Sequence, residues 1–291
     1  MIGDFTYLRP KSVREALSML SELKEGAKVL AGGQSLLIIM KEELLSPTHV
    51  IDIKGLSEWN FIQEEKGTLR IGALTSHRDI EVSPIVVSWF PVLSEMEHHI
   101  ASWPIRNWGT LGGNLCHGEP RSDPPALLIA LGASAKLVSK KGKRTVPLSA
   151  FFVGPYETVL RPDELLSEVL IPRLPRRSTC AFSRFALGEG TFPLVSVGVF
   201  IQLEDGRRTC KEARVVVGGA SPVPFRATKA EEMLSGVSLS RVRNGLSVQA
   251  SEEASRQSDP ASDIYGSVEY KRELVKVMVK RAIMRASEDV K

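Results

Sequence analysis

Cysteine is scarce in this chain of 291 residues, which contains only Cys116, Cys180 and Cys210. The three are far apart and odd in number, and no C-x-x-C spacing occurs. They therefore fit neither a disulfide framework nor a zinc or iron–sulfur site. We expect this chain to bind no metal of its own and any metal centre to belong to a partner.

Long apolar runs and a dominant charge are also missing. The longest apolar stretch, Ala126 to Leu131, is too short to cross a bilayer, and the chain starts without the pattern of a signal peptide. We therefore expect a cytoplasmic protein with no membrane span. The net charge is +4, with Lys and Arg scattered among acids, which argues against nucleic-acid binding. The densest basic run, 140–144, predicts a hairpin turn, with an anion-binding patch as the alternative.

The two commonest nucleotide-binding fingerprints are absent as well. No G-x-G-x-x-G opens a helix after a strand, and no G-x-x-x-x-G-K-[ST] occurs, which argues against a Rossmann or P-loop site. Instead the chain has two glycine pairs, each followed by an amide side chain, at Gly32-Gly33-Gln34 and Gly112-Gly113-Asn114. Consecutive glycines can turn several backbone N–H groups toward one anion. The pairs predict a two-loop pyrophosphate cradle, although each could simply mark a tight turn.

Periodicity predicts a mixed first region. Ser12 opens a capping box, and apolar residues recur at helical spacing from there to Gly26. Strand patterns follow at 28–30, 50–53, 68–74, 135–138, 145–148 and 168–171, with helical patterns at 75–105 and 126–131. The region is expected to begin with a β-α-β unit. Gly132 is expected to end the helix predicted at 126–131.

A second region follows the proline-rich linker 172–177. Strand patterns at 181–187, 194–203 and 212–217 precede a helical pattern at 268–286. Strands followed by helices favour a small α+β domain. The chain is long enough for two domains with separate cores.

Residues just after the second glycine pair leave two choices open. Asp123 can accept hydrogen bonds from ribose or ribityl hydroxyls, or it can cap the helix that follows. Cys116 and His117 allow a nucleophile or metal site, but neighbours in sequence need not face one target. Packing is the alternative for this pair.

These motifs together carry a family resemblance. The chain resembles the FAD-binding medium subunit of the molybdenum hydroxylases, which include bacterial xanthine dehydrogenases, carbon monoxide dehydrogenases, and aldehyde or aromatic hydroxylases. The resemblance covers nearly the whole chain and rests on segments 5–10, 105–114 and 218–222. It implies an α+β fold with a two-lobed FAD-binding domain of the vanillyl-alcohol-oxidase (PCMH) type at 1–176, its lobes about 1–55 and 56–176. A C-terminal domain of the carbon monoxide dehydrogenase flavoprotein type, with a small antiparallel sheet and helices, is expected at 177–291.

The resemblance also implies a cofactor site and no catalytic side chain. Residues of the first loop are expected to bind the FAD pyrophosphate through backbone amides, and the second loop to complete the cradle. Asp123 is expected at the ribityl and diphosphate groups, with Leu166 and Ile100 at the isoalloxazine ring; ordinary core packing is the alternative for these two. The expected FAD-binding residues are Val29, Leu30, Ala31, Gly32, Gly33, Gln34, Ser35, Leu36, Ile100, Thr110, Leu111, Gly112, Gly113, Asn114, Asp123, Leu166 and Arg184.

One segment departs from the family pattern. Relatives usually carry a lysine, an arginine and an aspartate where this chain has Arg184, Gly188 and Thr191. Arg184 keeps the positive charge, but guanidinium and ammonium groups differ in hydrogen-bond geometry. We expect an altered polar network near the flavin.

By resemblance, the chain is the electron-exit subunit of a hydroxylase complex. Electrons would pass from the [2Fe–2S] clusters of a small subunit through FAD to NAD⁺, oxygen, a quinone or another acceptor. A large subunit would hold the molybdenum cofactor, in a dimer of heterotrimers. The alternatives are a self-contained FAD oxidoreductase and a flavin-free scaffold subunit.

Overall fold

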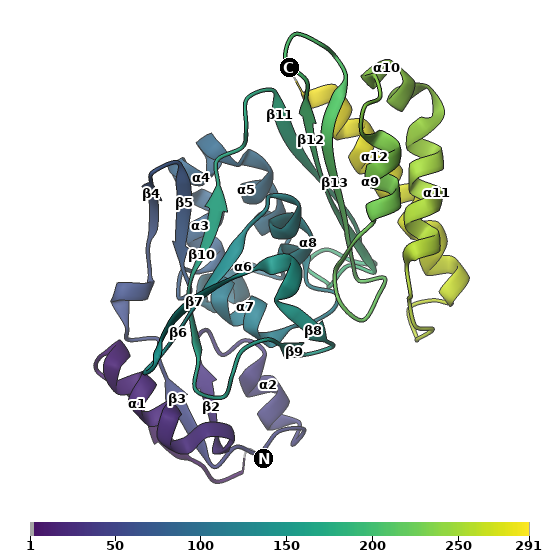
Figure 1. The fold of residues 1–291 in the computed structure, drawn as a ribbon. Helices are drawn as coiled ribbons and strands as arrows, with labels where there is room; N and C mark the ends of the chain where they lie inside the picture. The colour runs from purple at the N-terminus through teal and green to yellow at the C-terminus, as the bar shows by residue number, and fades with distance from the viewer. Residues whose placement is uncertain (1–2, 291) are drawn as a thin grey trace.

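The structure of the protein is a computed structural model that describes residues 3–290. Residues 1, 2 and 291, which belong to the predicted domain ranges, lie outside the described residues. Figure 1 shows an N-terminal lobe, a middle lobe, and a C-terminal sheet with a helical layer on its outer side. The predicted α+β fold class is confirmed.

The N-terminal lobe is a three-stranded parallel sheet with the order β1-β3-β2. Its strands are β1 (Thr6–Leu8), β2 (Ala27–Leu30) and β3 (His49–Asp52), and its helices are α1 (Val13–Leu23) and α2 (Leu36–Lys41). Ser12 caps α1 as predicted, accepting a hydrogen bond from the Glu15 N–H. Helix α1 is followed by a short 3-10 helix, η1 (Lys24–Gly26). Because the strands are parallel, the first glycine loop leaves β2 at the carboxyl edge of the sheet.

The middle lobe contains a five-stranded antiparallel sheet with the order β4-β5-β10-β6-β7. Its strands are β4 (Ile62–Glu65), β5 (Thr68–Gly72), β6 (Ser134–Ser139), β7 (Gly142–Pro147) and β10 (Leu165–Pro172). The basic run lies at the tight β6–β7 turn, as predicted. A small hairpin of β8 (Phe152–Gly154) and β9 (Glu157–Thr158) and the 3-10 helices η2 (Ser57–Trp59) and η3 (Leu148–Ala150) complete the connections.

Six helices of the middle lobe pack beside this sheet. They are α3 (His77–Val82), α4 (Pro84–Trp89), α5 (Pro91–His98), α6 (Trp103–Trp108), α7 (Leu111–His117) and α8 (Asp123–Ala130). Proline stands in the first turn of α4, α5, α6 and α8, where its missing N–H costs nothing. Gly132, with φ +75°, follows α8 in the left-handed conformation predicted for it.

The C-terminal domain is an antiparallel sheet with the order β11-β12-β13-β14. Its strands are β11 (Ser178–Phe185), β12 (Val195–Leu203), β13 (Cys210–Gly218) and β14 (Phe225–Arg226). Its helices are α9 (Thr228–Leu234), α10 (Leu239–Arg241), the π-helical turn η4 (Val242–Leu246), α11 (Ser247–Gln257) and α12 (Val268–Asp289). The predicted boundary at residue 176 falls in the connection between β10 and β11, and the domain limits stay a prediction.

Both faces of the C-terminal sheet are covered, which explains its nearly continuous apolar strands. Val197 and Val199 belong to the core shared with the C-terminal helices, whereas Phe200 and Val216 belong to the core of the middle lobe. Successive residues point to opposite faces of a strand, so one sheet serves both cores. The two domains are therefore joined through the sheet face that packs on α8 (Figure 1).

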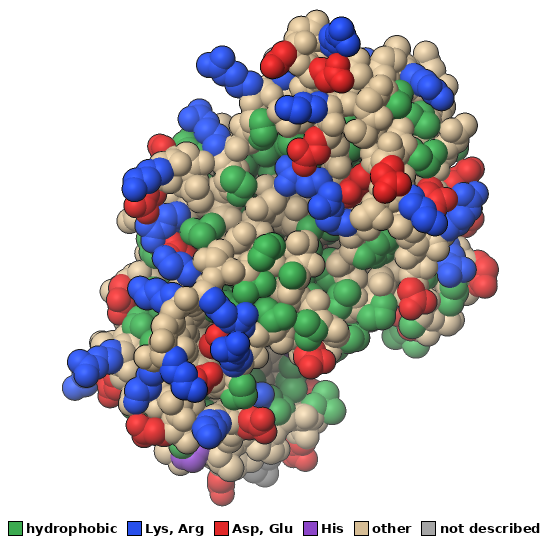
Figure 2. All heavy atoms as spheres, viewed as in Figure 1, with side chains coloured by type: hydrophobic (Ala, Val, Ile, Leu, Met, Phe, Trp, Pro, Cys, Tyr) green, Lys and Arg blue, Asp and Glu red, His purple; other side chains and the backbone are tan. Residues whose placement is uncertain are grey.

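The described residues contain no helix long and apolar enough to cross a membrane. On the face shown in Figure 2, Lys and Arg side chains lie among Asp and Glu side chains, and hydrophobic side chains gather near its middle. This face therefore shows the mixed charge that the sequence predicts.

The contact between α8 and β12 predicts a strong effect at Gly198. A Cβ added there would lie 2.6 Å from the Ala126 carbonyl oxygen, so a side chain must push α8 off the sheet. We expect Gly198→Val to lower the free energy of unfolding by about 1–3 kcal/mol in urea titrations. As a control, Gly55→Ala meets no atom closer than 3.8 Å and should stay within about 0.5 kcal/mol of wild type. Equal urea midpoints for Gly198→Val and Gly55→Ala would contradict the close approach.

Candidate functional site

The first glycine loop presents a run of unpaired main-chain donors. It connects β2 to α2, and Gly33 has φ +77°, a conformation that favours glycine. Gln34 folds back over the loop, with its Nε2 donating to the Gly32 carbonyl at 3.2 Å. No backbone N–H from Ala31 to Leu36 donates to an acceptor within residues 3–290. Adjacent free N–H groups are the donor set of an anion-binding nest, as the sequence predicts for this loop.

The second glycine loop behaves differently. Thr110 caps α7, and its Oγ1 accepts a hydrogen bond from the Gly113 N–H at 3.1 Å. The other N–H groups of this turn also donate within the protein: Leu111 to Thr75, Gly112 to Ala73 and Asn114 to the Thr110 carbonyl. The expectation that both glycine pairs turn free N–H groups toward an anion is therefore wrong for this loop. Its amides are consumed by helix capping and by contacts with the β5 end.

Close packing explains the glycines of the second loop. A Cβ added at Gly112 would lie 2.6 Å from the Ala73 Cβ, closer than side chains approach. A Cβ at Gly113 would lie 2.8 Å from the Thr110 Oγ1. These glycines let α7 begin directly against β5, so their conformational freedom serves packing more than binding.

Asn114 is the donor that the second loop does offer. The Ser122 hydroxyl donates to its Oδ1 at 2.7 Å and so fixes the orientation of the amide. The Nδ2 group has no acceptor among residues 3–290. An oriented amide with free N–H groups suits an anionic oxygen.

The two loops lie side by side. A Cβ at Gly32 would lie only 2.2 Å from the Trp108 carbonyl oxygen, and one at Gly109 would lie 3.6 Å from the Gln34 Cγ. A Cβ at Gly113 would lie 3.7 Å from the Ala31 Cβ. The fold thus brings the free N–H groups of the first loop next to α7 and Asn114. Val29 and Leu30 lead into this site from β2.

Asp123 lies at the start of α8, where it pairs with Arg184 from β11. The Arg184 Nε is 3.1 Å from the Asp123 Oδ1, and Asp123 is 5% exposed. The alternative that Asp123 caps α8 is wrong, because Ser122 occupies the cap position and the carboxylate bonds to Arg184 instead. Burial raises the pKa of Asp123 to about 7, while the charge and hydrogen bond of Arg184 oppose this shift.

The segment that departs from the family pattern forms a closed turn. The Thr191 hydroxyl donates to the Gly188 carbonyl at 2.8 Å, and the Gly188 N–H lies 3.3 Å from the same hydroxyl oxygen. The Thr191 carbonyl accepts from the Arg184 Nη2 at 2.7 Å. A hydroxyl-based turn therefore holds Arg184 where relatives are expected to use charged residues.

Leu166 and Ile100 both lie in or against the middle-lobe core. Leu166, beside a bulge in β10, is 4% exposed and shares a core cluster with Leu111 and Leu115 of α7. Ile100 follows α5 and packs partly buried against the same cluster. Core packing is evident for both, and their places beside an isoalloxazine ring stay predictions.

Cys116 and His117 do not form a nucleophilic pair. Burial raises the pKa of the Cys116 thiol to about 12, so the thiol stays protonated near neutral pH. The His117 ring packs against Tyr156, with 5.2 Å between the ring centroids. Within residues 3–290 no group of three or more His, Cys, Asp or Glu side chains is arranged to hold a metal ion.

Sequence analysis missed two residues of this site. Ser122 orients Asn114, and the buried Arg106 donates to the carbonyl groups of Ile100 and Ala101. Both stand inside or beside the motifs singled out above, and their partners lie only five to eight residues away, so each contact depends on how the intervening turn folds. Position alone gave no signal for either contact.

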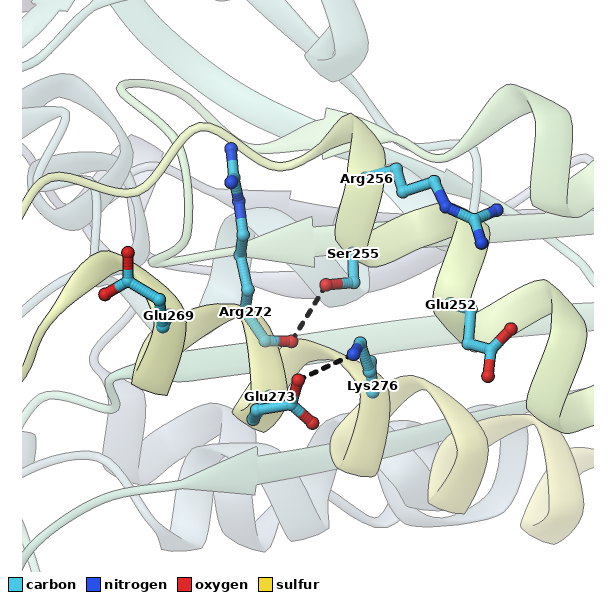
Figure 3. Close-up of a pocket in the computed structure, with 7 residues that line it drawn as sticks. All are labelled: Glu252, Ser255, Arg256, Glu269, Arg272, Glu273 and Lys276. Atoms are coloured by element: carbon cyan, nitrogen blue, oxygen red, sulfur yellow. Dashed lines mark hydrogen bonds and ion pairs between the residues drawn. The ribbon is translucent and has the colours of Figure 1, made fainter.

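Two cavities lie in different parts of the molecule. A cavity of 250 Å³ adjoins Arg184 and His99 and is also lined by Met278 and Arg281 of α12. A larger groove of 510 Å³ lies between α11 and α12, where Ser255 bonds to the Arg272 carbonyl and Lys276 pairs with Glu273 (Figure 3). The larger groove contains none of the predicted site residues, so size does not locate the glycine-loop site.

Comparisons with known proteins agree along the whole chain. Residues 3–174 match the model of the FAD binding domain in molybdopterin dehydrogenase, and 181–286 match that of the CO dehydrogenase flavoprotein C-terminal domain. The carbon monoxide dehydrogenase medium chain of Hydrogenophaga pseudoflava is 36% identical, over 97% of this chain and 96% of that protein. The nicotine 6-hydroxylase medium subunit of Paenarthrobacter nicotinovorans is also 36% identical, over 96% of each chain.

Solved structures give the same result. This chain is similar to a chain of carbon monoxide dehydrogenase from Hydrogenophaga pseudoflava, with a TM-score of 0.95, 35% identity and 100% of both chains covered. It is also similar to a chain of quinoline 2-oxidoreductase from Pseudomonas putida, with a TM-score of 0.90, 30% identity, and 99% and 98% covered. The cofactor of the chain is FAD, and the free donors of Ala31 to Leu36 fit its pyrophosphate. The chain belongs to the FAD-binding medium subunits of the molybdenum hydroxylase family of oxidoreductases.

Proposed function

We propose that this chain is the electron-exit subunit of a three-subunit hydroxylase. In this proposal it receives electrons from the [2Fe–2S] clusters of a small subunit and passes them through FAD to NAD⁺, oxygen, a quinone or another acceptor. A large subunit with the molybdenum cofactor oxidises the substrate, and the complex is a dimer of heterotrimers. The observation that carries the proposal is the run of free N–H groups from Ala31 to Leu36 set against Asn114.

The main chain can hold a pyrophosphate here without a cationic side chain. Each N–H bonded to an anionic oxygen makes a charge-assisted hydrogen bond, about twice as strong as a neutral one. The Asn114 Nδ2 adds a donor from the opposite loop, because Ser122 already satisfies the Oδ1. Gln34 stays bonded to the Gly32 carbonyl and so stabilises the loop itself. These contacts bind and orient the cofactor without moving a proton.

Other residues of the site shape the rest of the cofactor pocket in this proposal. Asp123 and Arg184 form the polar wall, with Ile100 and Leu166 the apolar wall. FAD, when bound, supplies the redox chemistry, and the protein supplies position and electrostatics. The cofactor-binding set that we propose is Val29 to Leu36, Ile100, Thr110 to Asn114, Asp123, Leu166 and Arg184.

Asn114→Ala tests the donor from the second loop. The variant loses one hydrogen bond to a charged group, worth about 1.5–3 kcal/mol, so FAD affinity should fall about 10-fold to 100-fold. Titration of FAD into the FAD-free chain, followed by flavin fluorescence, measures the change. The matched control is Asn60→Ala on an exposed loop far along the chain, which should bind FAD as wild type does. An unchanged dissociation constant for Asn114→Ala would remove Asn114 from the site.

Gly113→Val tests the function as a whole. The added Cβ would lie 2.8 Å from the Thr110 Oγ1, so it must displace the Thr110 cap of α7, and the side chain stands where the Ala31 Cβ of the first loop is 3.7 Å away. We expect the variant, co-expressed with its partner subunits, to assemble but to retain less than about one tenth of the wild-type FAD, with electron transfer to the acceptor lost in step. Visible absorbance per assembled complex and reduction of the acceptor are the measurements.

Measurements on the wild-type complex, on Gly113→Val and on the isolated chain together separate the candidate functions. A wild-type complex without FAD, or one whose activity survives loss of FAD, favours a flavin-free scaffold. Oxidation of simple alcohols or aldehydes by the isolated FAD-loaded chain favours a self-contained oxidoreductase. Gly55→Val serves as the control, because a Cβ there meets only the Arg9 guanidinium at 3.8 Å.

Asp123 should make stability depend on pH. Its folded pKa of about 7 lies above the ordinary value of 3.8, so the folded protein binds the extra proton between these values. The stability that Asp123 contributes to the folded chain is fully present below pH 3.8 and is lost as pH rises toward 7. Asp123→Asn lacks this titration, so wild type should lose roughly 2 to 4 kcal/mol relative to the variant between about pH 4 and pH 8. Urea unfolding of the FAD-free chains measures this, and parallel pH profiles would contradict it.

A further inference from the structure

Several ion pairs and hydrogen bonds fix the turn after α5. Residues His99 to Ala101 form this turn, which carries Ile100, and Glu97 and His98 end the helix before it. The Glu97 carboxylate lies 2.7 Å from the His77 Nδ1, and the His98 Nδ1 lies 2.7 Å from the Glu81 carboxylate. Both partners belong to α3, so α3 fixes the end of α5 before Ile100 is reached.

Arg106 holds the remainder of the turn. Its guanidinium is 3% exposed, and its Nη1 donates to the Ile100 carbonyl at 2.8 Å and to the Ala101 carbonyl at 3.3 Å. Its Nε donates to Glu81 at 3.1 Å. Hydrogen bonds from a buried cation to carbonyl groups are among the stronger ones in proteins. One side chain therefore fixes the backbone of two successive residues.

The backbone of Ala101 needs such support. Its φ is +43°, in the left-handed region, where a residue with a Cβ is strained. A non-glycine residue keeps this conformation only where its surroundings determine it. The two carbonyl contacts of Arg106 are such surroundings.

Glu81 anchors Arg106 as a carboxylate. Burial opposes its ionisation, but hydrogen bonds from His98 and Arg78 and the charge of Arg106 hold the pKa of Glu81 below its ordinary value. The Arg78 Nη1 is 3.1 Å from the same carboxylate. Arg78 bonds to Glu81 and lies over the Trp103 ring of α6 at 4.4 Å, whereas Arg106 bonds to the turn carbonyls themselves, so Arg78 is a suitable control for Arg106.

The turn also contacts the C-terminal domain next to the Asp123 pair. A Cβ at Gly190, where φ is +70°, would lie 2.7 Å from the Ala101 carbonyl oxygen. The next residue, Thr191, accepts the hydrogen bond from Arg184, and Arg184 bonds to Asp123. Contacts thus run without a break from Arg106 through Ala101 and Gly190 to Asp123.

We propose that Arg106 is a positioning residue of the flavin site. By holding the left-handed turn at Ala101, it sets the place of Ile100 and, through Gly190 and Thr191, the geometry of the Arg184–Asp123 pair. This inference rests on the proposed function for the assignment of Ile100 and Asp123 to the flavin. It does not require Arg106 to touch the cofactor.

Arg106→Lys is the first test, made in the chain co-expressed with its partner subunits. The ammonium group keeps the charge beside Glu81, but a lysine cannot reproduce the fixed fork of donors that serves Glu81 and two carbonyls together. We expect FAD content to stay at the wild-type level, because the glycine loops are untouched, while the visible circular dichroism of the flavin changes. In the FAD-free chain, amide hydrogen exchange at residues 98–101 should accelerate about tenfold or more.

Two further variants distinguish positioning from a general structural role. Arg78→Gln removes a different cation from Glu81 and should leave both the flavin dichroism and the exchange rates at wild-type values. Arg106→Lys combined with Ala101→Gly should recover both signals, because glycine adopts a positive φ without strain. The double variant also decides the question if Arg106→Lys alone does not fold.

Several results would overturn the inference. Unchanged dichroism and exchange in Arg106→Lys would do so, as would an Arg78→Gln variant with the same changes or a double variant that shows no recovery. The exchange measurement needs no cofactor. Absence of FAD from the wild-type complex would therefore contradict the proposed function. Wild-type amide exchange rates in Arg106→Lys would contradict this inference alone.

Discussion

The site depends on main-chain donors that have no acceptor among residues 3–290. Backbone N–H groups are almost always paired in a folded protein, so a run of free ones from Ala31 to Leu36 marks a place prepared for a ligand. The N–H groups of the second loop, by contrast, are already bonded within the protein. In the proposed function, the first loop donates to the FAD pyrophosphate, and the second allows close approach and supplies Asn114.

The packing that joins the two domains also builds the polar wall of the site. Helix α8 lies against β12 at Gly198, and Asp123 stands at the first turn of that helix. Arg184 reaches Asp123 from β11 of the same C-terminal sheet. Any shift of α8 on the sheet would therefore move the two members of this ion pair apart. The C-terminal domain thus pairs with Asp123 through Arg184, which the proposed function places at the cofactor, as well as packing against the middle lobe.

Similarity over nearly the full chain extends to proteins named for carbon monoxide, nicotine and quinoline. Within this common fold, the turn at Gly188 and Thr191 is where we expect a local difference. Its hydroxyl hydrogen bonds close the turn without charges, and its carbonyl holds Arg184. In the altered network expected near the flavin, a turn closed by a hydroxyl group therefore supports the Arg184 guanidinium.

Local patterns in the sequence determined much of the fold. The capping box at Ser12, the left-handed Gly132 and the basic hairpin turn were each predictable, because neighbouring residues decide caps, helix ends and tight turns. The family motifs indicated the cofactor and the two glycine loops. Sequence also pointed to Asp123, although it left capping open as its role.

Tertiary structure alone decided which donors are free and which side chains meet. Thr110, Thr75 and Ala73 take up the amides of the second loop, and only the folded chain shows those acceptors. Ser122 orients the Asn114 amide by a hydrogen bond, and Arg184 pairs with Asp123. Arg106, on α6, donates to two carbonyl groups of the turn before that helix. Hydrogen bonds and ion pairs of this kind depend on distances of a few ångströms between elements, which periodicity and spacing along one chain do not contain.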